Sequence, residues 1–549
     1  MGSSASKPLP ASGEMSEKSA ATQSLERQLG RSGRASARPD ASLNLHHSTD
    51  RSYKIQASRL VAHTAAAPQQ ESARDAGKAS SNITPTLLQY WSDTALKTTS
   101  AKLAARTLHN EQLALALRDR RTEIEMGNHV FNVKVDLEGT PVCNQKSSGR
   151  CWLFATLNLL RVHAMKEYDV PALELSQSYL HFYDKLEKAN TFLENTIDLA
   201  SEALDSRLYG YLKGDPVNDG GQWDMVVNLL RVYGIVPQVI FPESFNSSNS
   251  DKINWLVTFQ LRQFALELRS LISQLRSQEG GARSLSPASE HSIVQQVRLT
   301  KERQMKKIFE ILTIANGAAP PSPEQEFTWQ YYDSKGKYQE RRFTPKSFLQ
   351  SLKKRFDLDN ACSLVNDPRA EEQKLITIDR LQNVWGARPV SYVNTSSQVM
   401  KESVIKSLRS NQAVFFGCDV GQFSHTASGV MCPSLYQTGV EEAFDISLNL
   451  SKAERLQMGE SLMTHAMVIT GVQVDADGKP TRYRVENSWS ETAGQKGYMI
   501  MSDAWFDQYV FQVVVRKQDM PAALWQLFDA GVNEETIVYP PYDPFGSLA

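Results

Sequence analysis

The chain has 549 residues, is 41% hydrophobic and 22% charged, and carries a formal net charge of −1. This length suits roughly two to four subdomains of a globular protein, and the balanced charge excludes binding to nucleic acids or membranes through overall charge. Because the five cysteines lack regular spacing and no apolar run reaches the ~18–20 residues of a membrane span, we expect a soluble intracellular protein without a disulfide framework.

Residues 1–82 are rich in Ser, Ala and Gln and poor in aromatic residues. They cannot bury enough apolar surface to offset the entropy of ordering, so we expect a disordered extension. Two targeting signals compete with this interpretation, and both stay open. Met1-Gly2-Ser3-Ser4-Ala5-Ser6 fits the myristoylation pattern, with Gly2 as the acceptor. Arginines at helical spacing in a Ser-rich segment are typical of a mitochondrial transit segment, namely Arg27, Arg31, Arg34 and Arg38.

Residues 83–143 are expected to form an N-terminal arm. Apolar residues recur at helical spacing from Ile83 to Arg121, and Thr84-Pro85 is typical of a helix start. The alternation of apolar and polar side chains from Val130 to Val135 predicts a strand. The turn Gly139-Thr140-Pro141 then leads into a polar, glycine-containing loop.

The most informative stretch is this loop and the helical pattern that follows it from Cys151. A thiol in the first turn of a helix faces unpaired backbone N–H groups and the positive end of the helix dipole. This setting favours the nucleophilic thiolate, so we expect a lowered pKa for Cys151. Gln145 can direct its side-chain amide toward an oxyanion beside the Cys151 N–H. The other cysteines are interpreted as small buried hydrophobes, namely Cys143, Cys362, Cys418 and Cys432.

The predicted helix runs from Cys151 to about Tyr168 and is followed by Pro171. His163 lies twelve residues along it, or ~18 Å, so it cannot serve as the base for Cys151. We expect His163 to face solvent or a polar partner. Further on, the adjacent glycines Gly220 and Gly221 can let a substrate backbone approach closely, although such a pair is more often a simple turn.

The central part of the chain is dominated by helical periodicity from Asn254 to about Asn316, with a Ser- and Gly-rich break at residues 277–289. Phe327 to Tyr332 then predicts a strand, and a further helix begins near Thr344. Four cations on the second helix are either a solvated face or the basic lining of a channel, namely Lys301, Arg303, Lys306 and Lys307.

Two histidines are candidates for the catalytic base. His425 follows the apolar strand predicted at residues 413–418, and His465 begins another. Asn487 lies 22 positions after His465, on what reads as the neighbouring antiparallel strand, where its amide can hold the imidazole. Trp489 can shield that hydrogen bond from water. His465 is therefore preferred, and His425 is interpreted as a loop residue.

These motifs resemble the bleomycin hydrolase branch of the papain-like cysteine proteases. The resemblance covers about residues 83–549. It rests on Gln145-x5-Cys151-Trp152 and on the segments Asn144–Phe154, Phe182–Asn190, Asp219–Gln222, Ser461–Met467 and Arg484–Trp489. One departure is Ser490, where the family usually has glycine after the tryptophan.

The resemblance implies an α+β, papain-like fold with a helical insertion and two terminal arms. The divisions it implies are an extension (1–82), an N-terminal arm (83–143), a helical left domain with the nucleophile (144–240), a helical insertion (241–370), a β-rich right domain with the histidine and asparagine (371–535) and a C-terminal arm (536–549). Catalytic roles then fall to Cys151, His465 and Asn487, with Gln145 at the oxyanion and Trp489 in support. Gly220 and Gly221 pair with the substrate backbone.

In this family the C-terminal arm lies in the catalytic cleft, so the carboxylate of Ala549 is implied to meet the α-amino group of a peptide substrate. The resemblance further implies bleomycin and homocysteine-thiolactone hydrolysis, a homohexamer that could bind single-stranded nucleic acid in a channel, and a cytoplasmic or mitochondrial location. No metal or organic cofactor is implied. Two other functions stay open: a cysteine acyltransferase, and a nucleic-acid-binding or regulatory scaffold with incidental peptidase activity.

Overall fold

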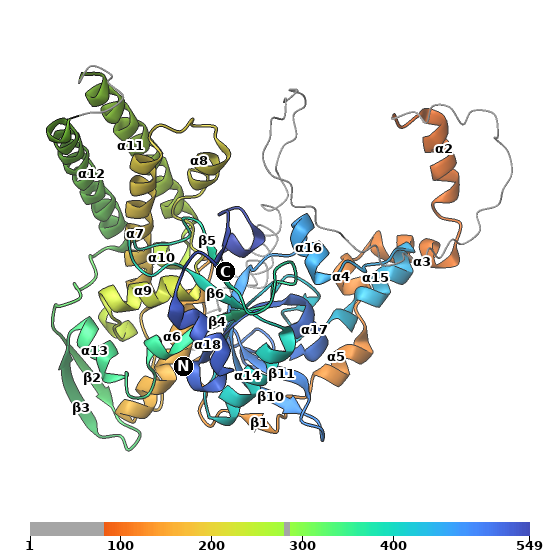
Figure 1. The fold of residues 1–549 in the computed structure, drawn as a ribbon. Coiled ribbons are helices and arrows are strands. Elements are labelled where there is room, and N and C mark those ends of the chain that lie inside the picture. The colour runs from red at the N-terminus through yellow and green to blue at the C-terminus, as the bar shows by residue number, and fades with distance from the viewer. Residues whose placement is uncertain (1–81, 279–285, 549) are drawn as a thin grey trace, which may run out of the picture. The chain divides into compact units, whose positions relative to one another are not determined.

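The computed structural model describes residues 82–278 and 286–548 (Figure 1). The chain divides into two units, residues 1–116 with 443–445 and residues 117–442 with 446–549. The predictions for Gly2, for nearly all of the extension and for Ala549 lie outside the described residues. Within the described ranges, no helix is both long and apolar enough to cross a membrane.

The first unit is helical where the structure describes it. It contains α2 (Pro85–Thr94), α3 (Thr99–Leu108) and α4 (Leu113–Ala116). The side chains of Thr84 and Thr98 accept backbone N–H bonds at the starts of α2 and α3, which satisfies donors that a helix start leaves unpaired. The predicted helical character of this segment is confirmed.

The second unit contains a group of helices that carries the candidate nucleophile. They are α5 (Arg120–Met126), α6 (Cys151–Tyr168), α7 (Gln177–Asp198), α8 (Arg207–Leu212), α9 (Trp223–Tyr233) and α10 (Phe245–Ser248). Nearly every residue of α6 is buried, as expected for a helix that is apolar on most of its faces. The predicted bounds of α6 are confirmed, and Asp169 ends it in a left-handed conformation.

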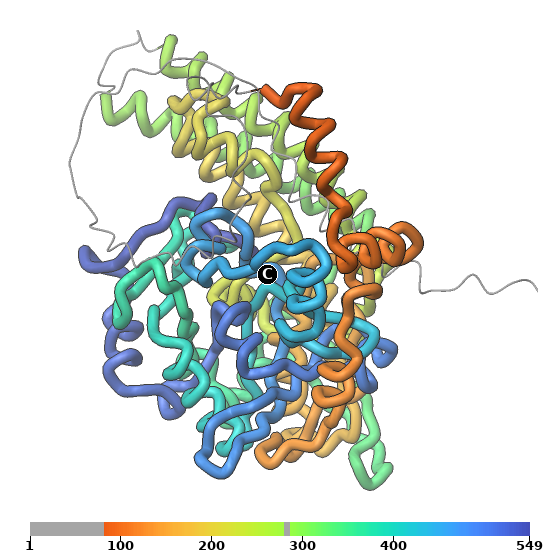
Figure 2. Tube along the Cα trace, turned by 90° about the vertical axis from the view of Figure 1, so that its right-hand side faces the viewer, coloured from red at the N-terminus to blue at the C-terminus, as the bar shows by residue number. Residues whose placement is uncertain are grey.

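Two long helices, α11 (Asp251–Gln278) and α12 (Pro287–Asn316), lie side by side and pack against α7 (Figures 1 and 2). Ser286 caps the start of α12, Pro287 occupies its first position, and Gly317 ends it with a positive φ of 81°. These residues are typical start and stop signals. The predicted helical region and its break are confirmed.

A twelve-stranded sheet forms the other half of the second unit, in the order β14-β5-β6-β4-β13-β7-β10-β11-β12-β9-β8, with β1 also paired to β10 within the described residues. Its strands are β1 (Val133–Lys134), β4 (Ala361–Val365), β5 (Leu375–Ile378), β6 (Ser391–Asn394), β7 (Val414–Cys418), β8 (Ser424–His425), β9 (Val430–Met431), β10 (His465–Val474), β11 (Pro480–Glu486), β12 (Tyr498–Ser502), β13 (Val510–Arg516) and β14 (Ile537–Tyr539). The combination of helices and sheet confirms the α+β class.

The strand predicted at residues 130–135 is shorter than expected, because only Val133 and Lys134 pair with β10. The reason lies in Asn132, whose side-chain amide bonds the backbone N–H and C=O of Val474 and so replaces a ladder hydrogen bond. The strand predicted at residues 327–332 is confirmed as β2 (Phe327–Tyr332), which forms a hairpin with β3 (Tyr338–Phe343).

The remaining helices lie between or after the strands along the chain. They are α13 (Pro345–Ser351), α14 (Ser397–Arg409), α15 (Gln437–Phe444), α16 (Lys452–Met458), α17 (Asp503–Tyr509) and α18 (Ala522–Ala530). Of these, α14, α17 and α18 pack on the sheet. Thr344 caps α13 as predicted. One hydrophobic cluster centres on α6, α7 and α9, and another lies between the sheet and α14 and α17. The candidate site lies where α6 packs on β10.

His163 is buried on α6, where its ring packs 5.3 Å from the ring of Phe356 and its Nε2 lies 3.4 Å from Gln412 Nε2. The predicted polar partner is thus confirmed. Burial lowers the pKa of His163 from 6.5 to about 4. Between these values the unfolded chain binds a proton that the folded chain excludes. The imidazole therefore contributes stability above pH 6.5 that is lost as the pH falls toward 4.

We expect His163→Gln to remove this contribution to the pH dependence. On acidification from pH 6.5 to 4.5, the free energy of unfolding of the wild type should fall relative to that of the variant, by up to about 1.4 kcal/mol per pH unit. Urea unfolding of both proteins at three pH values measures the difference. Two stability curves that stay parallel across this range would contradict the prediction.

Candidate active site

Cys151 occupies the first position of α6, and Arg150 before it provides no side-chain cap. The backbone N–H groups of Cys151, Trp152 and Ala466 face the thiol. Ala466 follows His465 directly on β10, and β10 packs on α6. Residues more than three hundred positions apart are thereby brought together at the end of one helix.

His465 is held by Asn487 across the antiparallel pair β10 and β11. His465 Nε2 lies 2.9 Å from Asn487 Oδ1, and Ser488 N donates to the same oxygen at 2.8 Å. The second bond establishes Oδ1 as an acceptor, so His465 Nε2 carries the proton and Nδ1 keeps a free lone pair. The Trp489 ring packs 4.8 Å from the imidazole. The predicted antiparallel pairing of the two strands is confirmed.

Gln145 lies in a loop that is pinned to the residues after β11. Its backbone N–H donates to Ser488 O at 2.9 Å, and Asn144 forms a β-bridge with Trp489. The Gln145 side chain is 5% exposed, and its Nε2 donates one hydrogen to Ser148 O at 2.8 Å. An amide nitrogen carries two hydrogens, so one donor of Gln145 is left for an oxyanion.

The prediction of a lowered pKa for Cys151 is wrong for this structure. Burial is the largest cause and raises the pKa of Cys151 to about 12, against the lowering effect of the three N–H groups around the sulfur. Burial likewise lowers the pKa of His465 to about 4, against the raising effect of its bond to Asn487. Both shifts favour the uncharged forms, a thiol and a neutral imidazole. The helix dipole favours the thiolate, but desolvation of the buried sulfur has the larger effect on its pKa.

The two glycines of the Asp219–Gln222 segment meet different neighbours. A Cβ added to Gly221 would lie 2.4 Å from the Trp152 ring, so this glycine is needed where α6 packs on the segment. A Cβ added to Gly220 would lie 2.6 Å from Leu548 Cβ. Trp152 Nε1 donates to Asp219 O at 2.7 Å and secures the same segment. Of the two glycines predicted to pair with a substrate backbone, Gly220 therefore lies beside the chain's own C-terminal arm and Gly221 beside Trp152.

The C-terminal arm is hydrogen-bonded to the segment before α9 and to the segment before β10. Gln222 Nε2 donates to Ser547 O at 2.8 Å, and Ser547 Oγ donates to Met463 O at 3.1 Å, two residues before His465. Upstream, Arg369 donates to both carboxylate oxygens of Asp543, at 2.9 and 3.2 Å. Sequence analysis missed Gln222 and Arg369 as arm-binding residues, although Gln222 belongs to the Asp219–Gln222 motif.

The alternative base His425 is not part of this constellation, whereas Cys418 lies beside it and its Sγ donates to His465 O at 3.7 Å. His425 is on β8, where its ring nitrogens lie 2.8 Å from Arg118 Nη1. The four remaining cysteines are buried and free, as predicted. No group of three or more His, Cys, Asp or Glu residues in the described ranges is placed to hold a metal ion.

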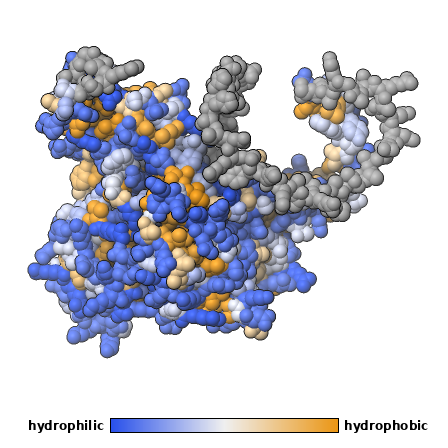
Figure 3. Space-filling view, in the orientation of Figure 1, coloured by the Kyte–Doolittle hydropathy of each residue, from blue (hydrophilic) through white to orange (hydrophobic). Residues whose placement is uncertain are grey.

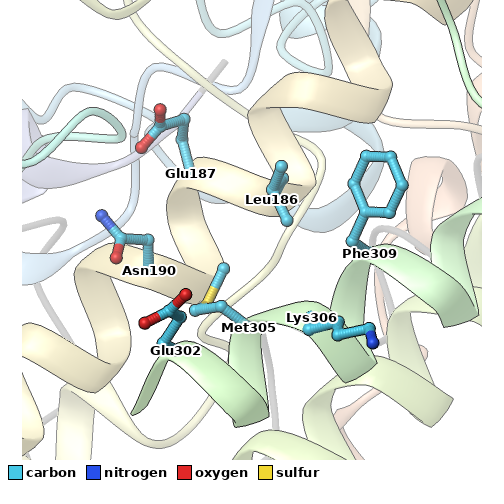
Figure 4. A pocket seen from close by; sticks show the side chains of 7 residues that line it. All are labelled: Leu186, Glu187, Asn190, Glu302, Met305, Lys306 and Phe309. Atoms are coloured by element: carbon cyan, nitrogen blue, oxygen red, sulfur yellow. The ribbon is translucent and has the colours of Figure 1, made fainter. Parts of the chain in front are cut away.

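A pocket of about 370 Å³ lies between α7 and α12 (Figure 4), and its lining includes Lys306 but none of the proposed catalytic or arm-binding residues. It is lined by Leu186, Glu187, Asn190, Glu302, Met305, Lys306 and Phe309. Of the cations considered as a channel lining, Lys301 pairs with the buried Glu194, and Lys307 lies 3.1 Å from Glu310. Acidic partners thus offset part of the charge of this helix.

Ser490, which replaces the usual glycine of the resembled motif, has a positive φ of 70°. This conformation costs a residue with a Cβ roughly 1–2 kcal/mol. Ser490 Oγ offsets part of that cost, since it lies 2.7 Å from Thr492 Oγ1 and accepts the Thr492 N–H at 3.2 Å. We expect Ser490→Gly to raise the free energy of unfolding by roughly 0.5–1 kcal/mol. Chemical denaturation tests this, and a destabilised variant would mean that the Oγ bonds dominate.

Comparison with known proteins gives consistent results. The peptidase C1-like family model matches residues 82–546. Cysteine proteinase 1, mitochondrial, of Saccharomyces cerevisiae (strain JAY291) is 39% identical over 472 residues, which cover 86% of this chain and 94% of the yeast protein. Bleomycin hydrolase of Homo sapiens is 39% identical over 439 residues, which cover 78% of this chain and 91% of the human protein.

Among solved structures, that of pepw from Lactobacillus rhamnosis HN001 (DR20) matches with a TM-score of 0.78 and 36% identity. The match covers 85% of this chain and all of the bacterial chain. The resemblance inferred from the sequence motifs is thereby confirmed over most of the chain.

Proposed function

Since the chain belongs to the peptidase C1-like family and is a cysteine peptidase with a papain-like α+β fold, we propose that it acts as an aminopeptidase of the bleomycin hydrolase type. The observation that carries this proposal is the contact of the C-terminal arm with Gly220, Gln222 and Met463, which lie near the proposed catalytic residues. Leu548 packs on Gly220, and Ser547 is bonded to Gln222 and Met463. An arm that fills one side of the cleft leaves room for a peptide only on the other side.

The proposed reaction starts from the neutral pair. His465 takes the proton from the Cys151 thiol as the sulfur attacks the first carbonyl carbon of the peptide. The tetrahedral oxyanion meets the Cys151 N–H and the free hydrogen of Gln145 Nε2. The C–N bond then breaks as His465 gives its proton to the leaving amine. A thioester remains on Cys151.

Water completes the cycle. His465 takes a proton from water as the oxygen attacks the thioester, and the C–S bond breaks to release the amino acid and restore the thiol. Asn487 accepts from the imidazole Nε2 throughout. It therefore stabilises each imidazolium that forms without adding a charge of its own.

Specificity for the N-terminus is proposed to come from the end of the arm. A peptide whose first residue lies at Cys151 brings its protonated α-amino group toward the chain terminus. The carboxylate of Ala549 can pair with that cation. An acylated amine carries no charge, and its acyl group would clash with the arm. One residue is then removed in each cycle.

Matched aminoacyl fluorogenic substrates test the proposal. The purified protein should hydrolyse the free-amino substrate, should leave its N-acetylated counterpart intact, and should lose activity after thiol alkylation. Equal hydrolysis of both substrates would contradict an aminopeptidase. Transfer of the acyl group to an added amine, rather than to water, would support the acyltransferase alternative.

Two further activities belong to the same proposal, namely hydrolysis of the bleomycin amide and of homocysteine thiolactone. Each substrate presents an acyl group near a free amine, which is the arrangement that the cleft is proposed to accept. Incubation with each compound, with Cys151→Ala as the control, tests them separately.

Assembly, nucleic-acid binding and cellular location are separate parts of the proposal. Apolar side chains reach the surface of the two long helices (Figure 3), among them Trp255, Phe259, Leu266, Leu299 and Ile314. Such a surface supports association, which we propose gives a homohexamer.

Salt-dependent binding of single-stranded oligonucleotides tests a basic channel. We propose a cytoplasmic and mitochondrial location, and the name of the yeast relative supports the latter. The division of the chain into six segments likewise stays a prediction.

A further inference from the structure

A fully buried ion pair joins the helix of the nucleophile to the strand of the orienting asparagine. Arg161 lies ten residues after Cys151 on α6, or about 15 Å along the axis. Its Nη2 donates to Glu486 Oε1 at 2.6 Å, and the two side chains are only 1% and 2% exposed. Glu486 is the residue directly before Asn487.

The same guanidinium holds the loop that leads to Gln145. Arg161 Nη1 donates to Pro141 O at 2.5 Å and lies 3.2 Å from Cys143 Sγ. A Cβ at Gly139 would lie 2.3 Å from Arg161 Nε. Only glycine at position 139 therefore leaves room for the side chain to enter the turn.

Beyond the contacts that Arg161 makes with Glu486 and with the Gly139–Cys143 turn, the loop that leads to Gln145 and the segment after β11 run side by side toward Cys151. Ser490 N donates to Cys143 O at 3.2 Å, and Gln145 N donates to Ser488 O at 2.9 Å. Helix α6 makes a second contact, from Asn158 Nδ2 to Ser488 Oγ at 3.4 Å. The nucleophile helix, the oxyanion loop and the Asn487 segment thus share Arg161 as a common contact.

We propose that Arg161, through Glu486 and the Gly139–Cys143 turn, is a positioning residue that sets Asn487 and Gln145 relative to Cys151. The proposal rests on the proposed peptidase function. Burying two ions costs several kcal/mol each, and apolar residues of similar size often serve stability as well or better. The directional bonds of a guanidinium are suited to setting geometry.

Stability and catalysis can be separated by mutation. Arg161→Met leaves the Glu486 carboxylate buried without its partner, so it should lower stability and lower kcat roughly 10- to 100-fold, with KM changed less than about twofold. The double variant Arg161→Met/Glu486→Met has no unpaired ion. It should regain the thermal stability but not the kcat. If the single variant does not fold, the double variant carries the test.

Arg484→Met is the matched control. Arg484 lies on the same strand and pairs with Glu138 at 2.7 Å. This pair is more exposed than Arg161–Glu486, at 13% and 15%, and the Arg484 guanidinium bonds Glu138 and His129 rather than Pro141 or Cys143. We expect its kcat to stay within about twofold of the wild type. A double variant that regains both stability and kcat, or a control that loses as much kcat as Arg161→Met, would overturn the positioning role.

The rate at which iodoacetamide alkylates Cys151 at neutral pH provides a readout independent of peptide hydrolysis. It should fall in both Arg161 variants, per folded molecule, because His465 is no longer held to take the thiol proton. A wild type that hydrolyses no aminoacyl substrate would defeat the proposed function, and the alkylation rates would still decide the role of Arg161. Unchanged alkylation rates in the folded double variant would defeat the positioning role alone.

Discussion

Cys151→Ala is expected to lower kcat for aminoacyl substrates roughly 10⁵-fold or more, which brings hydrolysis close to the uncatalysed rate. Without the sulfur no thioester can form, and His465 has no proton to take from a nucleophile. The variant should remain folded, because a small buried side chain is replaced by one of similar size. Steady-state kinetics and thermal unfolding of the same preparation measure both effects.

Two companion variants make this result specific to the site. His465→Ala should cause a loss comparable to Cys151→Ala, while Asn487→Ala should cost roughly 10- to 100-fold, since it removes only the group that orients the imidazole. Replacing Cys362, which is also buried but belongs to β4 and contacts Met520, should leave kcat nearly unchanged. Activity of Cys151→Ala within tenfold of the wild type would mean that another group is the nucleophile.

Deleting Leu548 and Ala549 is expected to change the specificity rather than abolish the chemistry. The shortened chain ends at Ser547, and its new terminal carboxylate would lie at the oxygen that Gln222 binds, two residues short of the proposed position of the substrate amine. The kcat/KM for free-amino substrates should fall roughly 10- to 100-fold, the value of one charged hydrogen bond. N-acetylated and internal peptide bonds should become substrates, because the cleft beside Gly220 is open.

Controls for the deletion keep the arm and change its attachment. Leu548→Ala preserves the chain length and the terminal carboxylate, so it should retain aminopeptidase activity. Asp543→Asn weakens the paired hydrogen bonds from Arg369 that hold the arm. It should shift specificity part of the way toward endopeptidase activity. Cleavage products identified by mass spectrometry distinguish these outcomes. An unchanged preference for free amines in the two-residue deletion would refute the role of the arm.

The parts of the site that could be predicted from the sequence are those encoded locally. The apolar run after Cys151 indicated a helix with the correct bounds, and the 22-residue spacing between His465 and Asn487, with a turn between, indicated the antiparallel pair that the structure shows. Hydrophobic periodicity and turn residues determine such features, so a single segment contains the information.

What could not be predicted depends on packing between distant segments. Arg161 and Glu486 are 325 positions apart, and neither has a spacing that marks it as a partner of the other. The raised pKa of Cys151 likewise depends on how completely β10 and the surrounding segments exclude water from the end of α6. The local pattern around Cys151 showed the favourable dipole but not the desolvation that outweighs it.

The most direct measurement is to trap the covalent intermediate. An aminoacyl ester substrate mixed with the protein and quenched in acid should leave an aminoacyl group in thioester linkage. Peptide mapping by mass spectrometry should locate this added mass on Cys151, and it should be absent in His465→Ala at the same quench time. An adduct on a different residue, or turnover without any acyl adduct on Cys151, would contradict the account.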